Sequence, residues 1–505
     1  MKTAEKSIHL NEKTVLGMDE TVRLRREEDS VLLYTSMRQG EETDEMAGVH
    51  YNVTSSVAVA LALFDGQQPL KEVFETVNYI WDKLQGLTFD KFCQSLEPFI
   101  IPNSKPLELK FPVLIEATSD NKERIRSYYD PKSLIIEGDK YCPFKSRRLK
   151  FPKRVDIMPT MACATDCVYC YMDRKHQSQD NIMPLERWKE LLAEMEPYQL
   201  ATLDMAGGDP MCYEHILDLL EIIGMFSPPT HTLLSTKCYI SPEVAQRLAK
   251  MPHVNFQISL DSTDPDIADA MTRRKGFCAK AIESIKNCVA AGLPVAAKAV
   301  LTPLNSKSIP QTILDLGDMG VDTIRIACYG TSYFHHTDDL FNSKKEWNEM
   351  SEKVERIKAE RGLKVQLQNG PPGAMADEFK SQEERAKRWA ERSLCTAGKS
   401  QITILGDGNL IGCEQLPQSP EYSWGNVAND SLYNVWNSDA FMQKACNIPR
   451  DKYEGTACFT CEEFEECHSS LGLGYCFREA YYSFDTIYAP PAGCPHIEPV
   501  IRRIS

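Results

Sequence analysis

The chain has 505 residues, of which 42% are hydrophobic and 26% charged, and 57 Lys and Arg against 72 Asp and Glu give a formal net charge of −15. This composition is typical of a globular protein with several domains, and it excludes extended disorder and a broad cationic surface for nucleic acid. The sequence contains neither a signal-peptide-like apolar segment nor an apolar run long enough to span a bilayer. We therefore expect a cytoplasmic protein with no nucleic acid and no membrane partner, whose 18 cysteines indicate metal or thiol chemistry.

Residues 20–105 predict a small amino-terminal domain. Strand patterns occur within 21–36 and 48–54, and helix patterns follow at 55–66, 69–85 and 89–100. Three strands followed by three helices predict a winged-helix-like fold. The helices are acidic, which argues against DNA binding. Residues 106–150 are expected to form a bridging region with some strand content.

Residues 151–335 alternate between strand-like and helix-like stretches. The strand-like stretches are 154–160, 200–208, 230–236, 254–260, 294–302 and 322–330. This alternation predicts an α/β domain with a parallel sheet flanked by helices. Ligands of such sheets collect at the carboxyl ends of the strands. Residues 336–394 are expected to be a linker and helical bridge.

Three cysteines directly follow the first of these strands. The segment "MACATDCVYCYM" places Cys163, Cys167 and Cys170 with three and then two residues between them. Three thiolates leave one iron of a four-iron cluster open, whereas a structural zinc site needs four ligands. This spacing, with Tyr169 before the last cysteine, resembles radical S-adenosylmethionine (SAM) enzymes. The alternatives are a zinc site with a distant fourth ligand, or three unrelated thiols.

The resemblance implies a partial (β/α)6 TIM-like barrel with a 4Fe-4S cluster on these cysteines and SAM chelated to the open iron. One electron from the cluster cleaves SAM, and the resulting 5'-deoxyadenosyl radical abstracts a hydrogen atom from the substrate. Such an enzyme needs an electron donor such as a flavodoxin or ferredoxin.

The resemblance also assigns SAM contacts to the strand ends. The segment "GGDP" resembles the family's Gly-Gly-Glu-Pro loop, with Asp209 in place of the commoner Glu. The residues expected by position to contact SAM are Tyr169, Gly207, Gly208, Asp209, Pro210, Ser235, Thr236, Ser259, Asp261 and Lys298. Taken singly, such glycines are more often turn residues, and Ser or Asp at a strand end is more often a helix cap.

Eight cysteines lie in residues 395–505, and residues 402–413 predict a hairpin around a Gly-Asp-Gly-Asn turn. The pattern resembles the SPASM domain, which holds two auxiliary 4Fe-4S clusters and would bring the total to three. By this resemblance the first auxiliary cluster takes Cys395, Cys413 and Cys476, and the second takes Cys458, Cys461, Cys467 and Cys494. The first cluster then needs a fourth ligand, either a residue other than Cys or a substrate thiolate.

The sequence departs from the SPASM pattern in two ways. Eight residues separate Cys467 from Cys476 where relatives usually have three, and residues 396–401 lack the extra cysteine that some relatives carry. A zinc ribbon is the alternative for the dense cysteine run. Glu414 occupies a position where sulfatase-activating relatives carry an acidic general base, so we expect it to be catalytic; the alternative is a surface glutamate.

Residues 20–105 resemble the PqqD-like recognition elements that bind the leader of a ribosomally synthesised precursor peptide as an added edge strand. The alternative is a packing domain. The whole chain is therefore predicted to be a radical SAM peptide maturase, an oxidoreductase that installs an intramolecular cross-link, with a Cys thioether as the leading product. A carbon–carbon link, oxidation of Cys or Ser to formylglycine, and a non-catalytic iron-sulfur or zinc regulator are the alternatives.

Overall fold

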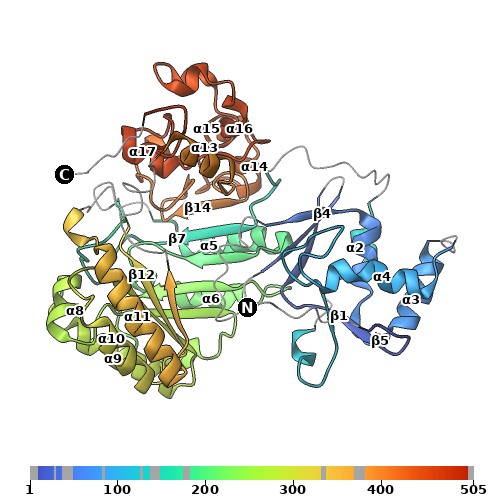
Figure 1. Ribbon diagram of the computed structural model, residues 1–505, viewed down its shortest axis with the longest axis horizontal. Coiled ribbons are helices and arrows are strands. Elements are labelled where there is room, and N and C mark those ends of the chain that lie inside the picture. Colours follow the sequence, from blue (N-terminus) through green and yellow to red (C-terminus); the bar gives the residue numbers. More distant parts are fainter. Residues whose placement is uncertain are drawn as a thin grey trace. The chain divides into compact units, whose positions relative to one another are not determined.

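The computed structural model of the chain describes residues 9–27, 30–36, 49–81, 86–125, 129–136, 148–173, 182–330, 337–368 and 381–498. The chain divides into two compact units (Figure 1). The first unit contains residues 1–38 and 42–144, and the second contains residues 39–41 and 145–505. No helix in the described ranges is both long and apolar enough to cross a membrane.

In its described residues the first unit combines two three-stranded antiparallel sheets with three α-helices. Its strands are β1 (Val15–Met18), β2 (Val22–Arg26), β3 (Val31–Thr35), β4 (Tyr51–Val53), β5 (Asp65–Pro69) and β6 (Leu114–Glu116), and its helices are α2 (Ser55–Ala62), α3 (Leu70–Ile80) and α4 (Phe89–Ile100). The sheet β2-β3-β4 followed by three helices matches the predicted order. The second sheet, β5-β1-β6, has no counterpart in the prediction. The helix expected over 55–66 ends at Ala62, because Asp65–Pro69 pairs with β1.

The helices of the first unit cover an apolar core of its own. α3 buries Leu70, Val73 and Val77, which share one face because they are spaced by three, four and seven residues. Thr54 caps α2, accepting a hydrogen bond from the Val57 amide at 3.3 Å. Buried residues of α2, α3 and α4 share one apolar cluster with those of β2 and β3, which explains why these segments form helices despite their β-branched content.

The second unit is built on a ten-stranded sheet with the order β13-β12-β11-β10-β9-β8-β7-β14-β15-β16. The strands are β7 (Arg154–Met158), β8 (Thr202–Met205), β9 (Thr232–Thr236), β10 (Val254–Ser259), β11 (Val295–Leu301), β12 (Thr323–Cys328), β13 (Val365–Gln368), β14 (Gln401–Leu405), β15 (Asn409–Ile411) and β16 (Gly425–Asn426). The pairs from β7 to β13 are all parallel. The predicted parallel α/β barrel is therefore confirmed.

Helices follow each of these parallel strands (Figure 1). The helices of the second unit are α5 (Leu185–Met195), α6 (Ile216–Ile223), α7 (Pro242–Leu248), α8 (Pro265–Thr272), α9 (Phe277–Ala290), α10 (Ile309–Asp318), α11 (Lys344–Arg361), α13 (Gln382–Ala390), α14 (Leu432–Trp436), α15 (Asp439–Ala445), α16 (Phe464–His468) and α17 (Phe477–Phe484). β11 alternates buried with half-buried residues along its length, as expected where one face packs on helices and the other lines the barrel.

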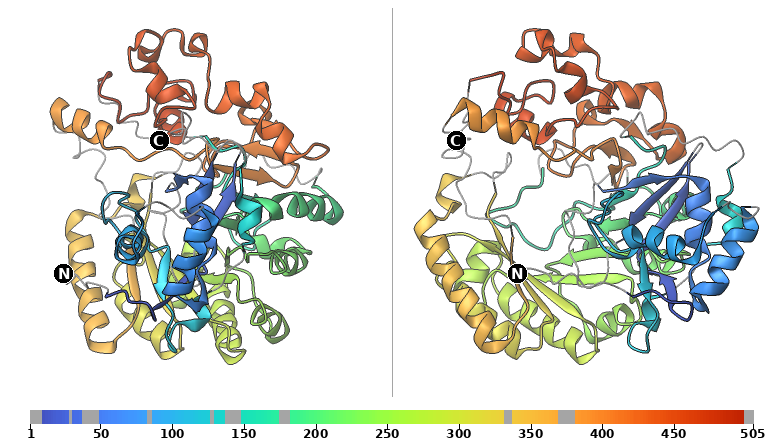
Figure 2. Two further views of the ribbon diagram at one scale, coloured as in Figure 1. Left: turned by 90° about the vertical axis from the view of Figure 1, so that its right-hand side faces the viewer. Right: turned by 45° about the vertical axis from the view of Figure 1, so that its right-hand side comes forward.

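The carboxyl-terminal cysteine region joins the barrel through β14. This strand pairs in parallel with β7, from Gln401 opposite Arg154 to Leu405 opposite Met158. β14 and β15 form the predicted antiparallel hairpin, and Gly408 in its turn has a φ of 84°. In Figure 2 the orange-to-red carboxyl-terminal segments lie on one side of this hairpin, and the green barrel strands lie on the other. A single apolar core runs from Val155 and Trp188 in the barrel to Trp436 and Tyr482.

Glu194 on α5 ties the barrel to the carboxyl-terminal region. Its carboxylate accepts hydrogen bonds from Ser431 Oγ at 2.8 Å and from the amides of Leu432 at 3.0 Å and Tyr433 at 2.8 Å. These groups form the amino-terminal end of α14, whose free amides favour a negative charge. One side chain thus satisfies three donors across the junction.

We predict that Glu194→Ala lowers the free energy of unfolding by about 2 kcal/mol, because it leaves these donors without their charged acceptor. Glu190→Ala is the control, since its exposed pair with Arg187 at 2.6 Å contributes about 0.5 kcal/mol or less. Anaerobic urea unfolding of both variants measures the difference. Equal midpoints for the two variants would show that the junction does not depend on Glu194.

Candidate active site

The loop after β7 carries the first three cysteines. Thr165 Oγ1 lies 3.6 Å from Cys163 Sγ and 3.3 Å from Cys167 Sγ, so one hydroxyl links two of the thiols. The amides of Asp166 and Val168 donate to the carbonyls of Thr272 and Met271 at the end of α8, at 3.0 and 2.9 Å. The loop is therefore held against the end of α8 by backbone hydrogen bonds.

A second set of contacts packs this loop on the β14–β15 hairpin. Met158 and Met172, which flank the cysteines, form a small buried cluster with Leu405 and Ile411 of the hairpin, and Cys170 lies against it. The cysteine loop thus rests on the carboxyl-terminal region as well as on the barrel.

Gly207 and Gly208 lie directly under the cysteine loop. The Gly208 amide donates to Thr160 O at 3.2 Å, and the Asp209 amide donates to Ala162 O at 2.8 Å. A Cβ on Gly207 would come within 2.4 Å of Thr160 O, and one on Gly208 within 2.2 Å of Met161 O. Gly207 also has a φ of 126°. The glycine pair is required here because the backbone of the cysteine loop leaves no room for a side chain.

Asp209 is buried and holds the ends of β8 and β9 together. Its carboxylate accepts from Thr236 Oγ1 at 2.7 Å, from the Lys237 amide at 2.7 Å and from the Met211 amide at 3.0 Å. Pro210 is also buried and starts the short helical turn that follows. Asp209 and Thr236, both predicted SAM contacts, therefore lie together and are hydrogen-bonded to each other.

Asp261 at the end of β10 is fully buried and gathers three groups. Its carboxylate accepts from Tyr169 Oη at 2.6 Å and from the Val300 amide at 2.9 Å, and it lies 3.5 Å from Lys237 Nζ. Burial and the Asp261 charge raise the pKa of Tyr169 well above its usual value, so the phenol stays protonated. Two predicted residues, Tyr169 and Asp261, therefore meet in one contact.

Lys237 is a buried cation of the site that was not predicted from the sequence. Burial disfavours its charge, but attraction by Asp261, Cys167 and Asp209 outweighs burial, so the pKa of Lys237 is raised and its ammonium stays charged. Its Nζ lies 5.7 Å from the ring centroid of Tyr169 and 5.6 Å from that of Phe277. In the sequence, only its position directly after Ser235 and Thr236 indicated that Lys237 could belong to the site.

Ser235 and Ser259 meet on neighbouring strands, with 3.3 Å between their Oγ atoms. Gln257 Nε2 donates to Ser235 Oγ at 2.9 Å. Lys298 pairs in register with Ser259 on the next strand. Hydroxyls and a cation from β9, β10 and β11 thus lie in one row, a donor set suited to a ligand that carries hydroxyl and carboxylate groups.

Glu414 lies next to Cys413 and contacts the residue that follows Cys170. Tyr171 Oη donates to Glu414 Oε1 at 3.0 Å. Burial and the charge of Asp156 raise the pKa of Glu414 to about 7, against the opposing effects of Tyr171, Arg154 and Lys298. A carboxyl group with this pKa can accept or release a proton near neutral pH. Tyr171 was not identified from the sequence.

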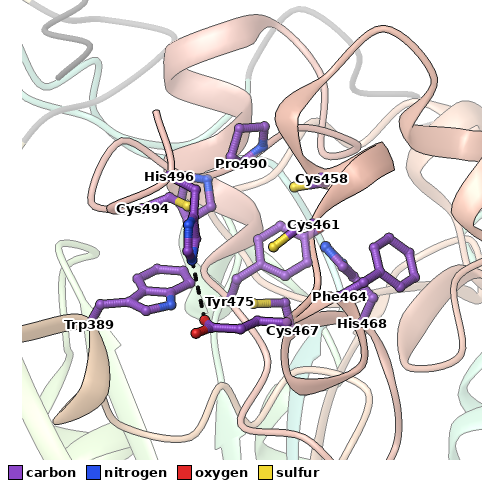
Figure 3. Close-up of a pocket in the computed structure, with 12 residues that line it drawn as sticks. Trp389, Cys458, Cys461, Phe464, Cys467, His468, Tyr475, Pro490, Cys494 and His496 are labelled. Atoms are coloured by element: carbon purple, nitrogen blue, oxygen red, sulfur yellow. Dashed lines mark hydrogen bonds and ion pairs between the residues drawn. The ribbon is translucent and has the colours of Figure 1, made fainter. Parts of the chain in front are cut away.

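The seven cysteines that the SPASM resemblance assigns to clusters fall into two groups. Cys476 lies close enough to Cys395 and Cys413 to disfavour ionisation of both, and burial is the main reason that the pKa of each of these two thiols is raised to about 12. The second group lines one pocket with Trp389, Phe464, His468 and Tyr475 (Figure 3); its members are Cys458, Cys461, Cys467 and Cys494. The resemblance to the SPASM domain implies the same two groups.

The donor chemistry of these groups fits iron-sulfur centres. Burial raises the pKa of Cys458 and Cys467 to about 12, so the thiolate form needs a bound cation to compensate its charge. Within the described ranges, no three His, Cys, Asp or Glu side chains converge on a single-ion site. The thiols are instead spread around their pocket.

Two family models match the chain. The radical SAM superfamily matches residues 157–316, and the iron-sulfur cluster-binding domain SPASM matches residues 395–462. The chain therefore contains a radical SAM domain, which binds SAM and a 4Fe-4S cluster, and a SPASM domain, which binds auxiliary iron-sulfur clusters. The predicted cofactors are confirmed.

Curated relatives and solved structures agree with these domains. Mycofactocin maturase MftC of Mycobacterium tuberculosis is 23% identical over 358 residues, which cover 68% of this chain and 83% of MftC. PqqA peptide cyclase of Ruegeria pomeroyi is 21% identical over 289 residues, which cover 56% of this chain and 72% of that protein. The structure of Streptococcus suis SuiB bound to the precursor peptide SuiA superposes with a TM-score of 0.61 at 16% identity, covering 94% of this chain and 99% of SuiB, and so shares the fold.

We predict that Gly208→Ala removes the cluster of the radical SAM domain, because the added carbon forces Met161 and Ala162 away from the glycine loop. Iron analysis should show a loss of about four irons per chain, with loss of SAM cleavage. Gly330→Ala is the control, since its added carbon meets no described atom within 4 Å. Full iron content in Gly208→Ala would contradict this assignment.

Proposed function

We propose that this radical SAM enzyme modifies a ribosomally synthesised precursor peptide by installing an intramolecular cross-link. The observation that carries the proposal is the hydrogen bond between Tyr171 and Glu414, because it joins the residue after Cys170 to the residue after Cys413. Radical formation and proton removal can then act on one bound substrate. The names of MftC and PqqA peptide cyclase and the complex of SuiB with SuiA support a peptide substrate.

Cys163, Cys167 and Cys170 hold the cluster that, with bound SAM, supplies the 5'-deoxyadenosyl radical. Asp209 and Asp261 keep the surrounding loops in place through their hydrogen bonds. The row formed by Ser235, Ser259 and Lys298 contacts SAM, with the Lys298 ammonium available for its carboxylate. Seven SPASM thiols hold two auxiliary clusters, in the two groups described above.

The amino-terminal unit binds the leader of the precursor. β4 pairs with β3 through Tyr51 and its neighbours, and we expect the leader to add as a further strand to this small sheet. Backbone hydrogen bonds along a sheet edge hold an extended peptide with little demand on its sequence. The core segment of the peptide then remains free to reach the barrel.

A thioether is the product that we favour. Removal of a hydrogen atom leaves a carbon radical on the core peptide, and attack by a cysteine thiol forms the C–S bond with release of one proton and one electron. Glu414 accepts the proton, as its pKa of about 7 allows. The electron requires an acceptor, a role open to the auxiliary clusters. A flavodoxin or ferredoxin supplies the electron that starts each turnover.

The test incubates the reconstituted full-length enzyme with SAM, a reductant and a cysteine-containing precursor peptide encoded beside its gene. Mass spectrometry should find a product that has lost two hydrogen atoms and no longer reacts with iodoacetamide. The same mass loss with a reactive thiol would indicate a carbon–carbon link, and an aldehyde would indicate formylglycine. SAM cleavage without any change in peptides carrying an intact leader would contradict peptide maturation.

Glu414→Gln should lower the yield of cross-linked peptide by roughly 100-fold or more, because the amide cannot accept the proton, while 5'-deoxyadenosine is still formed. Tyr171→Phe removes only the hydrogen bond to Glu414 and should cause a smaller loss. Chromatography of peptide and 5'-deoxyadenosine from the same reactions measures both yields. Wild-type cross-linking by Glu414→Gln would exclude this residue as the base.

A further inference from the structure

Arg392 lies between the two groups of SPASM cysteines. Its Nη2 donates to Cys467 Sγ at 3.7 Å, so one of its N–H groups points at a thiol of the four-cysteine pocket. Its Nε donates to Gly474 O at 3.1 Å, two residues before Cys476. Arg392 itself precedes Cys395 by three residues. The guanidinium therefore touches the pocket of Cys467 and the segment leading to Cys476.

The guanidinium is held rigidly. Its Nη1 donates to Trp389 O at 2.7 Å, and its central carbon lies 4.1 Å from the centroid of the Trp389 ring. All three nitrogen atoms thus have a partner, and in the described part of the chain none of these partners is a carboxylate. Trp389 also lines the four-cysteine pocket (Figure 3). A positive charge that has no carboxylate among its hydrogen-bond partners is therefore fixed beside Cys467, and the Glu463 carboxylate lies in the same pocket.

Other cations near these thiols donate to backbone carbonyls. Arg450 donates to the carbonyls of Phe459 and Cys461 at 3.1 and 3.0 Å. Lys399 donates to the carbonyl of Ser469 at 2.8 Å. Arg385 donates to the carbonyl of Cys494 and its charge also acts on that thiol, whereas Arg392 donates to a sulfur atom of the pocket.

We propose that Arg392 is a positioning residue that raises the reduction potential of the auxiliary cluster held by Cys458, Cys461, Cys467 and Cys494. Reduction adds one negative charge to such a cluster, and hydrogen bonds and positive charge at its sulfur ligands stabilise the reduced form. A higher potential makes the cluster a better acceptor for the electron that the substrate releases. This inference rests on the SPASM cluster and does not require a peptide substrate.

The test is a redox titration of the reconstituted holoenzyme, followed by electron paramagnetic resonance, for wild type, Arg392→Met and Arg392→Lys. Arg392→Met removes the charge and the N–H group, so one cluster midpoint should move to a more negative potential, with the other two unchanged and the iron content equal to wild type. Arg392→Lys retains the charge and should recover part of the shift.

Unchanged midpoints in Arg392→Met with full iron content would overturn the proposal. Should that variant bind less iron, Arg392→Gln is titrated instead, since it is neutral and keeps an N–H donor; a negative shift of one midpoint supports the proposal, and a wild-type value overturns it. The readout needs no peptide, so an enzyme that fails to modify peptides but shows the shift would refute only the proposed function.

Discussion

The parallel pairing of β14 with β7 is the constraint on which the active site depends. It adds a strand from the carboxyl-terminal region to the barrel sheet, in a register that runs from Gln401 and Arg154 to Leu405 and Met158. The hairpin that starts with β14 supports the cysteine loop through a small apolar cluster and leads to Cys413 and Glu414. Without this pairing the Tyr171–Glu414 hydrogen bond would have to form between two independent domains. Because β7, β14 and β15 belong to one sheet, the segments that follow β7 and β15 lie close together, and Tyr171 and Glu414 meet although they are 243 positions apart in the chain.

Two buried carboxylates complete the site. Asp209 and Asp261 each accept bonds from a neighbouring strand end, and together they fix the loops after β8, β9 and β10. A buried carboxylate without such partners would cost several kcal/mol, so the surrounding donors are as important as the acids themselves. Lys237 supplies the compensating charge for Asp261. The cofactor loops are therefore ordered by the protein's own polar groups, and the glycine pair allows the cysteine loop to lie directly against them.

Much of this arrangement was predictable from sequence. Local patterns in the sequence predicted the cysteine loop over Cys163–Cys170, the alternation of strands and helices, and the hairpin over 402–413. The structure contains the alternating elements and the hairpin. The sheet β5-β1-β6 and the addition of β14 to the barrel depend on pairing between distant segments, which short-range periodicity does not encode. The sequence did not identify Lys237, Tyr171 or Arg392 as site residues for a related reason. Each of them contacts a residue far along the chain, and no spacing rule specifies such a contact.

The most direct test of the central claim compares wild type with a variant in which Cys163, Cys167 and Cys170 are all changed to Ala. Both proteins are reconstituted anaerobically with iron and sulfide and assayed for iron and for 5'-deoxyadenosine in the presence of SAM and a reductant. Wild type should hold roughly twelve irons, as three four-iron clusters require, and the variant should lose about four of them together with all SAM cleavage. A wild-type protein that binds zinc and forms no 5'-deoxyadenosine, or a variant that still cleaves SAM, would contradict radical chemistry at this loop.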